Sequence, residues 1–227
     1  MLCKIADLYA RIPETGGMTP RLRDYATQDK ASPDIVIREE KYDASRWPHT
    51  PKSLLPYMDS GFLFYAKLLC FGGMMLHASA VELDGRAYLF SGPSGIGKST
   101  HAHVWEKAYG ARIFNDDKPA LRERDGVWYA YGTPWCGKSG ININLRAPVA
   151  GICFLRRGAC TVMRRLDPVE AATAIISQTN NRFEQEQNLN IMVDTVEKLI
   201  FAVPIYELTG NCPAESARLS YQTMLVR

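Results

Sequence analysis

The stretch LHASAVELDGRAYLFSGPSGIGKST, residues 76–100, contains the pattern that decides the fold. Two short strand-like runs, 76–83 and 86–90, are joined by Asp84 and Gly85. This link predicts a tight β-hairpin, because glycine supplies the positive φ that a type I′ turn needs. The second arm of the hairpin enters a glycine-rich loop, and a helix-like run follows the loop.

The loop from Gly92 to Ser99 fits the phosphate-binding pattern G-x-x-x-x-G-K-[ST] at every position. Successive backbone N–H groups of such a loop surround phosphate oxygens, and the next helix points its positive dipole end at them. Lys98 then reaches the β- and γ-phosphates, and the Ser99 hydroxyl binds Mg²⁺. The residues expected to hold the nucleotide are Gly92, Pro93, Ser94, Gly95, Ile96, Gly97, Lys98, Ser99 and Thr100.

The register of the hairpin brings a histidine to this loop. If Leu83 faces Arg86 across the turn, His77 faces Gly92. The histidine is then either an active-site group or a hydrogen-bonded core residue. In ordinary P-loop NTPases the strand before the loop lies in a parallel sheet, whereas a hairpin makes it antiparallel to its sequence neighbour. A parallel partner for 86–90 would contradict a fold based on the hairpin.

A second Asp-Gly link, at 125–126, predicts a hairpin between PALRER and VWYAYG. Its register places Asp117 opposite Pro134, so the acid pair Asp116-Asp117 meets the loop 133–140. The acids end the strand-like run ARIF, which follows the helix after the phosphate loop. Walker-B-type acids have this place in other NTPases. The position therefore favours a Mg²⁺ ligand and a catalytic base over a solvated turn.

Together, His77, the first hairpin, the loop and the acid pair resemble the catalytic domain of HPr kinase/phosphorylase. The fold of that family is related to ATP-dependent phosphoenolpyruvate carboxykinase. The resemblance covers roughly residues 75–165 and extends to HPr-kinase-like proteins that phosphorylate a serine of lasso-peptide precursors. It implies an α/β (α+β) P-loop domain with a mixed or antiparallel sheet, a hairpin leading into the Walker A loop, and C-terminal helices.

The resemblance also implies a role for each matching residue. Lys98 would bind the phosphates of ATP, Ser99 would ligate Mg²⁺, and His77 matches the active-site histidine of the family. Asp116 would be the general base that takes the proton of an acceptor hydroxyl. Asp117 would ligate the metal or hold the base. A carboxylate suits the base role because phosphoryl transfer depends mainly on positioning and charge neutralisation.

The segment GTPWCGKSGININ after the acids departs from the family pattern, because it lacks the acid that the family uses on Mg²⁺. The helices that recognise HPr are not evident either, so HPr is not the expected acceptor. Lys138 is a candidate substrate-binding group, since the second hairpin returns its loop to the acids. Arg146, Arg156 and Arg157 are either similar groups or surface charge. Trp135 lines the acceptor pocket, stacks on a base, or is simply packed.

The first 60 residues are punctuated by prolines and predict a small N-terminal lobe or sheet extension before a P-loop domain of residues 61–227. CKIADLYARI and DIVIREEKY read as its strands, and 60–71 as a buried helix. Farther along, ININL and AGICFLRR are strand-like.

The C-terminal part of the chain reads as mostly helical. Asp167 is an N-cap, with proline at the first helical position and an acid three residues after the cap. Apolar residues from Leu189 to Ile200 recur at helical spacing, and Pro204 ends that helix. PIYEL reads as a strand and PAESARLSYQTML as a last helix.

Composition limits the class of protein. The chain has 227 residues, 46% of them hydrophobic, and a net charge of +3, which is too slight to indicate a nucleic-acid partner. Six cysteines without metal-ligand spacing read as reduced thiols, and no signal-peptide run begins the chain, so we expect a cytoplasmic protein. The apolar run 61–81 contains Lys67 and His77 and is split by Gly72-Gly73, so a buried segment is expected and no membrane partner.

Three functions remain open on the sequence. The first is an ATP-dependent kinase that transfers the γ-phosphoryl group to a hydroxyl of a peptide, a protein or a small molecule. The second is an ATP-binding switch or sensor with slow ATPase activity, and the third is a small-metabolite kinase on the ordinary parallel P-loop fold. A kinase should have an open acceptor pocket facing Asp116, whereas a switch should close that face with its own side chains. The family resemblance also allows a homo-oligomer.

Overall fold

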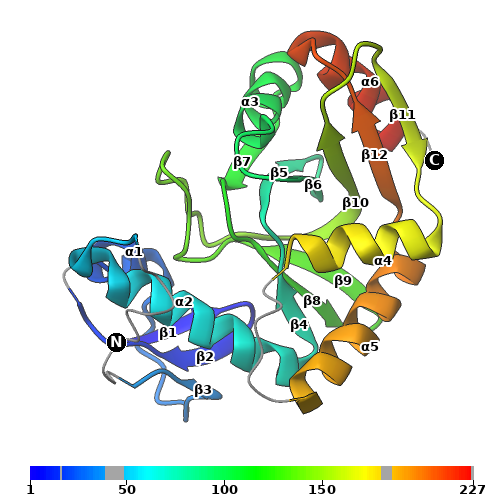
Figure 1. Ribbon diagram of the computed structural model, residues 1–227. Coiled ribbons are helices and arrows are strands. Elements are labelled where there is room, and N and C mark those ends of the chain that lie inside the picture. Colours follow the sequence, from blue (N-terminus) through cyan, green and yellow to red (C-terminus); the bar gives the residue numbers. More distant parts are fainter. Residues whose placement is uncertain (16, 39–48, 180–185, 226–227) are drawn as a thin grey trace.

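The computed structural model describes residues 1–15, 17–38, 49–179 and 186–225 (Figure 1). The strands are β1 (Leu2–Ile5), β2 (Leu8–Arg11), β3 (Ile35–Val36), β4 (Gly73–Met75), β5 (Ala78–Leu83), β6 (Arg86–Ser91), β7 (Arg112–Asn115), β8 (Ala120–Arg124), β9 (Val127–Tyr131), β10 (Arg146–Arg156), β11 (Val162–Arg165) and β12 (Ile205–Thr209). The α-helices are α1 (Thr19–Leu22), α2 (Leu55–Leu68), α3 (Lys98–Tyr109), α4 (Pro168–Ser177), α5 (Glu186–Ala202) and α6 (Pro213–Leu225), and the short 3₁₀ helices are η1 (Arg23–Tyr25), η3 (Lys52–Leu54) and η4 (Leu69–Phe71).

A curled mixed sheet organises the described part of the chain. Its strands run in the order β4-β8-β9-β10-β6-β5-β7, with β12 paired to β10 and β11 paired to β12. The long strand β10 joins two halves of this sheet: residues 146–148 pair antiparallel with β9, and residues 149–154 pair parallel with β6. The fold is therefore α/β, as expected, with both strand directions in one sheet.

The first predicted hairpin is confirmed. Strands β5 and β6 pair antiparallel from Leu83–Arg86 at the turn to Ala78–Ser91 at the far end. His77 lies one residue beyond the last pair, and its carbonyl accepts a hydrogen bond from the Ser91 hydroxyl (2.9 Å).

The expectation that the strand before the phosphate loop has no parallel partner is wrong. Strand β6 has β5 as an antiparallel partner on one edge and β10 as a parallel partner on the other. Parallel pairing here comes from β10, which returns after a long connection that includes the second hairpin. Strand direction alone therefore does not separate an HPr-kinase-like domain from an ordinary P-loop kinase.

The second hairpin is also confirmed, with Arg124 opposite Val127 and the ladder ending at Ala120–Tyr131. The prediction that ININL is a strand is wrong: strand β10 begins only at Arg146, and of the five residues only Asn142 forms an isolated bridge. The segment passes so close to Gly132 that a Cβ on this glycine would lie 1.8 Å from the Ile143 carbonyl oxygen. Close passage over the end of β9 replaces strand pairing here.

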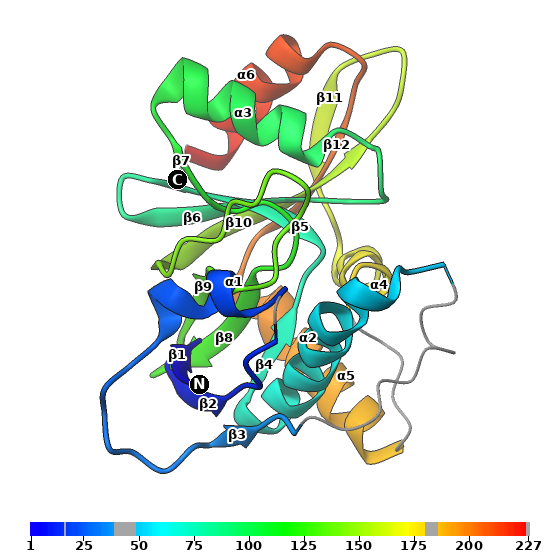
Figure 2. The same cartoon turned by 90° about the vertical axis from the view of Figure 1, so that its left-hand side faces the viewer.

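Two helical layers cover the half of the sheet that contains the phosphate loop. Helices α3 and α6 lie side by side on one face (Figure 2), where Trp105 packs against Tyr88 and Phe90. Helices α4 and α5 cover the opposite face, where Ile175 of α4 and Leu89 of β6 belong to one buried cluster. Successive residues of β6 point to opposite faces of the sheet, so one strand supplies both cores.

The C-terminal helices form where the sequence predicts them. Helix α4 begins with a capping box in which the Asp167 carboxylate accepts the N–H groups of Val169 and Glu170, both at 2.9 Å, while Glu170 accepts the N–H of Asp167. This arrangement satisfies donors that have no partner inside the helix.

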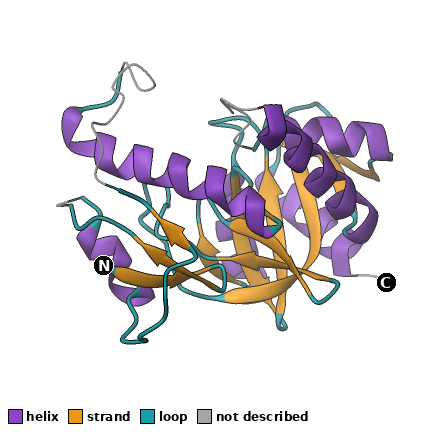
Figure 3. Ribbon diagram, turned by 90° about the horizontal axis from the view of Figure 1, so that it is seen from below, coloured by secondary structure: helices purple, strands orange, loops and turns teal. Residues whose placement is uncertain are grey.

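The N-terminal residues form a separate three-stranded sheet in the order β1-β2-β3. The run CKIADLYARI was expected to be one strand, but it is a hairpin that turns at Ala6 and Asp7, both with positive φ. Only Ile35–Val36 of DIVIREEKY is a strand, and residues 39–42 of that run lie outside the described residues. Helix α2 extends from this sheet toward the main sheet (Figure 3), and Phe64 belongs to the core that both share.

The apolar run 61–81 divides among α2, η4, β4 and the start of β5. None of the helices in the described ranges is long and apolar enough to cross a membrane.

Candidate active site

The phosphate loop connects β6 to the first turn of α3, as the sequence predicts. Gly92 has a φ of +138°, and a Cβ on it would lie 3.1 Å from the Leu155 carbonyl oxygen. Only glycine fits both constraints, because other residues rarely adopt this φ. Gly97 is the N-cap of α3, and no side chain caps this helix end. The first N–H groups of α3 therefore have no side-chain acceptor, as an anion site at a helix start requires.

Lys98 folds back over the loop. Its ammonium group donates to the carbonyl oxygens of Gly92 (2.9 Å) and Pro93 (3.2 Å). Burial lowers the pKa of Lys98, and the nearby charge of Asp117 partly offsets this effect. The lysine and one member of the acid pair are thus electrostatic neighbours.

His77 and Lys118 surround Asp117. The imidazole Nε2 of His77 lies 3.1 Å from Asp117 Oδ1, and the Lys118 ammonium donates to Oδ2. Burial by itself would raise the pKa of Asp117, but these hydrogen bonds and charges hold that pKa well below its usual value. The turn geometry that brings His77 to Gly92 therefore also brings it to the acids.

Asp116 is engaged differently. It is 6% exposed, and its two carboxylate oxygens accept backbone N–H groups of Gly137 (2.6 Å) and Ser139 (3.1 Å). A Cβ on Gly137 would lie 3.0 Å from Asp116 Oδ2, so glycine permits this close approach. The expected meeting of the acid pair with the loop 133–140 is confirmed. The loop 137–139 nevertheless covers this carboxylate.

A buried amide that the sequence analysis did not identify holds the acid pair in place. Asn115 Oδ1 accepts the N–H groups of Asp117 (3.1 Å) and Lys118 (2.7 Å), and its Nδ2 donates to the carbonyls of Thr133 (3.1 Å) and Trp135 (3.2 Å). One side chain thus ties the turn after β7 to the loop after β9. Its position directly before two acids was the available signal, because asparagine commonly hydrogen-bonds the backbone two residues on.

A second polar cluster joins the N-terminal region to the same loop. The Tyr57 hydroxyl donates to the Cys136 carbonyl and accepts the Cys136 N–H, both at 2.7 Å. The Arg21 guanidinium donates to the Cys136 sulfur (2.6 Å) and lies over the Tyr57 ring. Burial raises the pKa of the Cys136 thiol, although Arg21 partly opposes this. Arg21 and Tyr57 are far from the acids in sequence, and no local sequence pattern predicts that they contact this loop.

The three residues expected to bind substrate lie in different surroundings. Trp135 is 1% exposed, stacks on Phe64 and donates from its indole to Ser60 (3.2 Å), which favours the packing role that the sequence left open. Arg146 forms an ion pair with Asp7 of the N-terminal hairpin. Lys138 is exposed, between the two residues whose N–H groups bind Asp116. Of the three, Lys138 is the one whose backbone neighbours touch the acid pair.

With this geometry in place, comparison with known proteins gives a family. Residues 52–213 match the family model described as SynChlorMet cassette protein ScmC. The chain belongs to this family. The match begins just before α2 and ends at the start of α6, so it includes every residue of the phosphate loop and of the acid pair.

No curated protein matches the chain. Among solved structures, an HPr(Ser) kinase/phosphatase from Coxiella burnetii is similar over 66% of this chain and 96% of that chain, with 12% sequence identity and a TM-score of 0.39. A similarity this low says nothing about activity. The chemistry of this chain is therefore inferred from its own residues.

The acid pair and Ser99 fit a metal that arrives with a nucleotide. Within the described ranges no three histidine, cysteine or acidic side chains gather as a metal cage. Mg²⁺ bound to phosphates needs only one or two protein carboxylates. In Asp117 one carboxylate oxygen already binds a cation, the Lys118 ammonium. On these contacts Asp117 would hold Mg²⁺ in place of Lys118, and the loop pattern adds the Ser99 hydroxyl as an expected second ligand.

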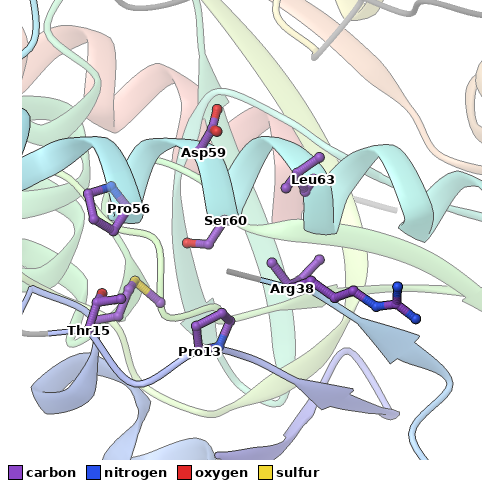
Figure 4. Close-up of a pocket in the computed structure, with 9 residues that line it drawn as sticks. Pro13, Thr15, Arg38, Pro56, Asp59, Ser60 and Leu63 are labelled. Carbon is purple, nitrogen blue, oxygen red and sulfur yellow. The ribbon is translucent and has the colours of Figure 1, made fainter. Parts of the chain in front are cut away.

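A small pocket between α2 and the N-terminal sheet lies apart from these groups (Figure 4). Its volume is about 10 Å³, which suits a single water molecule at most. Pro13, Ser60 and Leu63 are among its lining residues. It has no room for a substrate.

Proposed function

We propose that this protein is an ATP-dependent kinase that transfers the γ-phosphoryl group to a hydroxyl of a peptide, a protein or a small molecule. The observation that carries the proposal is one juxtaposition. The glycine loop ends at a helix start without a side-chain cap, and Lys98 of that helix lies within electrostatic reach of Asp117. Groups suited to phosphate and groups suited to cations or protons therefore share one site.

The surroundings of the two acids support different roles for them. Asp117 has a low pKa and already binds a cation, so it is a weak proton acceptor and a good metal ligand. Within the described residues the Asp116 carboxylate accepts the N–H groups of Gly137 and Ser139, and each of its oxygens has a second lone pair. We therefore assign the acceptor proton to Asp116. His77 orients Asp117, and Lys98 holds the phosphates.

Mg²⁺, when bound with ATP, would neutralise charge on the phosphates. The chain itself supplies positioning: the N–H groups of the loop and Lys98 bind the phosphates, and the 137–139 loop orients Asp116. A polar acceptor hydroxyl can replace one of these loop N–H contacts when it reaches the carboxylate.

The proposal is tested with γ-labelled ATP and a panel of hydroxyl acceptors. We expect Asp116→Asn to lower transfer by about 10²–10⁴-fold, the usual contribution of a general base. Lys98→Ala should lower it by about 10²-fold or more through lost phosphate stabilisation. Lys107→Ala, an exposed lysine on the same helix, is the matched control and should be silent. Unchanged transfer in Lys98→Ala and Asp116→Asn would refute the proposal.

The covered state of Asp116 favours a second candidate, an ATP-binding switch with slow hydrolysis. A carboxylate that is 6% exposed does not present a ready acceptor site. The same labelled-ATP experiment separates the two functions. A switch releases label only as inorganic phosphate with every acceptor, whereas a kinase moves label onto one of them.

A further inference from the structure

A second, larger pocket borders the phosphate loop. Its volume is about 380 Å³, within the range of small-molecule sites, roughly 300–1,000 Å³. It is enclosed by the phosphate loop, the ends of β10 and β12, and the start of α6. Residues 210–212, to which the sequence assigned neither strand nor helix, form one of its walls together with Pro213.

The walls of the pocket combine apolar and polar groups. Apolar side chains come from the loop, from the sheet and from the first residue of α6: Ile96, Leu155, Leu208 and Pro213. Polar groups come from the segment before α6, from α6 and from α3: Asn211, Ser216 and Thr100. A pocket that mixes apolar side chains with a few polar groups suits a flat heterocycle joined to a sugar.

The position of the pocket matches one end of a bound nucleotide. Gly95, Gly97 and Thr100 line it, whereas His77, Lys98 and the acid pair do not. Lys98 of a phosphate loop reaches the β- and γ-phosphates. The terminal phosphate therefore points toward the acids, and the other end of the nucleotide points into the pocket.

One arginine completes the pocket where the inner phosphate would leave the loop. Arg157 donates to the Gly95 carbonyl (3.0 Å), and this contact holds its guanidinium group at the loop. Arginine is well suited to phosphate oxygens. The Arg156 guanidinium instead pairs with Glu207 of β12, which also binds Arg164. Of the arginines that the sequence left between surface charge and function, Arg157 thus lies on the nucleotide side of the loop.

We propose that this pocket binds the base and ribose of the nucleoside triphosphate. The proposal rests on the proposed function, because it takes the phosphates to be on the loop. It assigns the 210–213 segment, Ser216 and Arg157 to nucleotide recognition. It also leaves the face of Asp116 to the acceptor.

Cysteine modification tests the assignment directly. Cys212 is exposed and lines the pocket, whereas Cys70 in η4 is exposed and does not. We expect Mg²⁺-ATP to slow the reaction of Cys212 with a thiol reagent by about tenfold at saturation, with Cys70 unchanged, because a bound nucleoside covers the pocket. Inorganic tripolyphosphate should occupy the loop and leave Cys212 reactive.

A pair of variants gives a second readout. Cys212→Phe places a ring in the mouth of the pocket, and we expect the affinity for ATP to fall by about tenfold or more while the affinity for tripolyphosphate stays the same. Ala214→Phe adds the same ring at an exposed position of α6 outside the pocket and should leave both affinities unchanged.

The outcomes separate this proposal from the one on which it rests. If ATP binds and Lys98→Ala abolishes the binding, but Cys212 is not protected and Cys212→Phe binds ATP normally, the pocket assignment alone is overturned. If neither ATP nor tripolyphosphate binds the wild-type protein, both proposals are overturned.

Discussion

The surroundings of His101 determine its charge and its role. It is 4% exposed, its Nε2 lies 2.9 Å from the Ser220 hydroxyl, and its ring packs on Phe90. Burial lowers the pKa of His101 to about 4. The side chain is therefore a neutral link between α3 and α6, the two helices beside the proposed nucleoside pocket.

This pKa predicts a loss of stability in acid. Because the unfolded chain binds the His101 proton near pH 6.5 and the folded chain only near pH 4, the free energy of unfolding falls as the pH drops through this window. At pH 5 the protonation of His101 in the unfolded chain lowers the free energy of unfolding by about 2 kcal/mol. Urea titrations at pH 7 and pH 5 should show a smaller loss for His101→Gln than for the wild type. Equal losses in both proteins would contradict a buried neutral histidine.

At the scale of the element, the 137–139 loop decides how Asp116 is presented. Gly137 and Ser139 act through their backbone, and a Cβ on Gly137 would make tight contacts, 3.0 Å from Asp116 Oδ2 and 3.2 Å from Asp117 Cβ. The loop lies against the acids because the Asn115 side chain binds both Thr133 at the start of the loop and Lys118 directly after the acids. A defect in this loop should therefore affect chemistry more than nucleotide binding.

We expect Gly137→Ala to lower kcat for phosphoryl transfer by about tenfold, because the added methyl group displaces the loop from Asp116. ATP affinity, measured by equilibrium binding, should stay within about twofold of the wild type. Ser139→Ala keeps the backbone N–H and is the control expected to be silent. A fall in ATP affinity with kcat preserved would show that the loop belongs to the nucleotide site instead.

At the scale of the whole molecule, the N-terminal hairpin is fixed to the main sheet by a buried charge. The Arg122 guanidinium on β8 donates to the carbonyls of Ala6 (2.8 Å) and Phe71 (2.9 Å). The Tyr131 hydroxyl and the Arg146 guanidinium both donate to Asp7 in the same turn. The N-terminal region that supplies Arg21 to the loop 133–140 is thus bound to the sheet through β8, β9 and β10.

Arg122→Met should lower the free energy of unfolding by about 2–3 kcal/mol, because a buried carbonyl and a partly buried one lose a charged donor. Arg124→Met, two residues along the same strand and exposed, is the matched control and should change it by less than about 0.5 kcal/mol. Chemical denaturation measures both. Equal effects of the two substitutions would mean that the buried donor adds nothing to this attachment.

Local chemistry made much of the fold predictable. The Asp84-Gly85 and Asp125-Gly126 turns form as expected, because positive φ at both turn residues is a local requirement. The capping box at Asp167 is equally local. ININL was not predictable, because its alternating apolar residues fit a strand and only the close passage over Gly132 prevents pairing.

The sequence by itself determined the two hairpins, the glycine-rich loop between β6 and α3, and the meeting of the acid pair with the loop 133–140, since each depends on a few neighbouring residues. Only the tertiary structure decided that β6 pairs in parallel with β10, that Asp116 is covered, and that Trp135 is packed in the core. It also formed the pocket between the ends of β10 and β12 and the start of α6. These features join segments far apart in the chain, and their contacts leave no signature in local periodicity or turn chemistry.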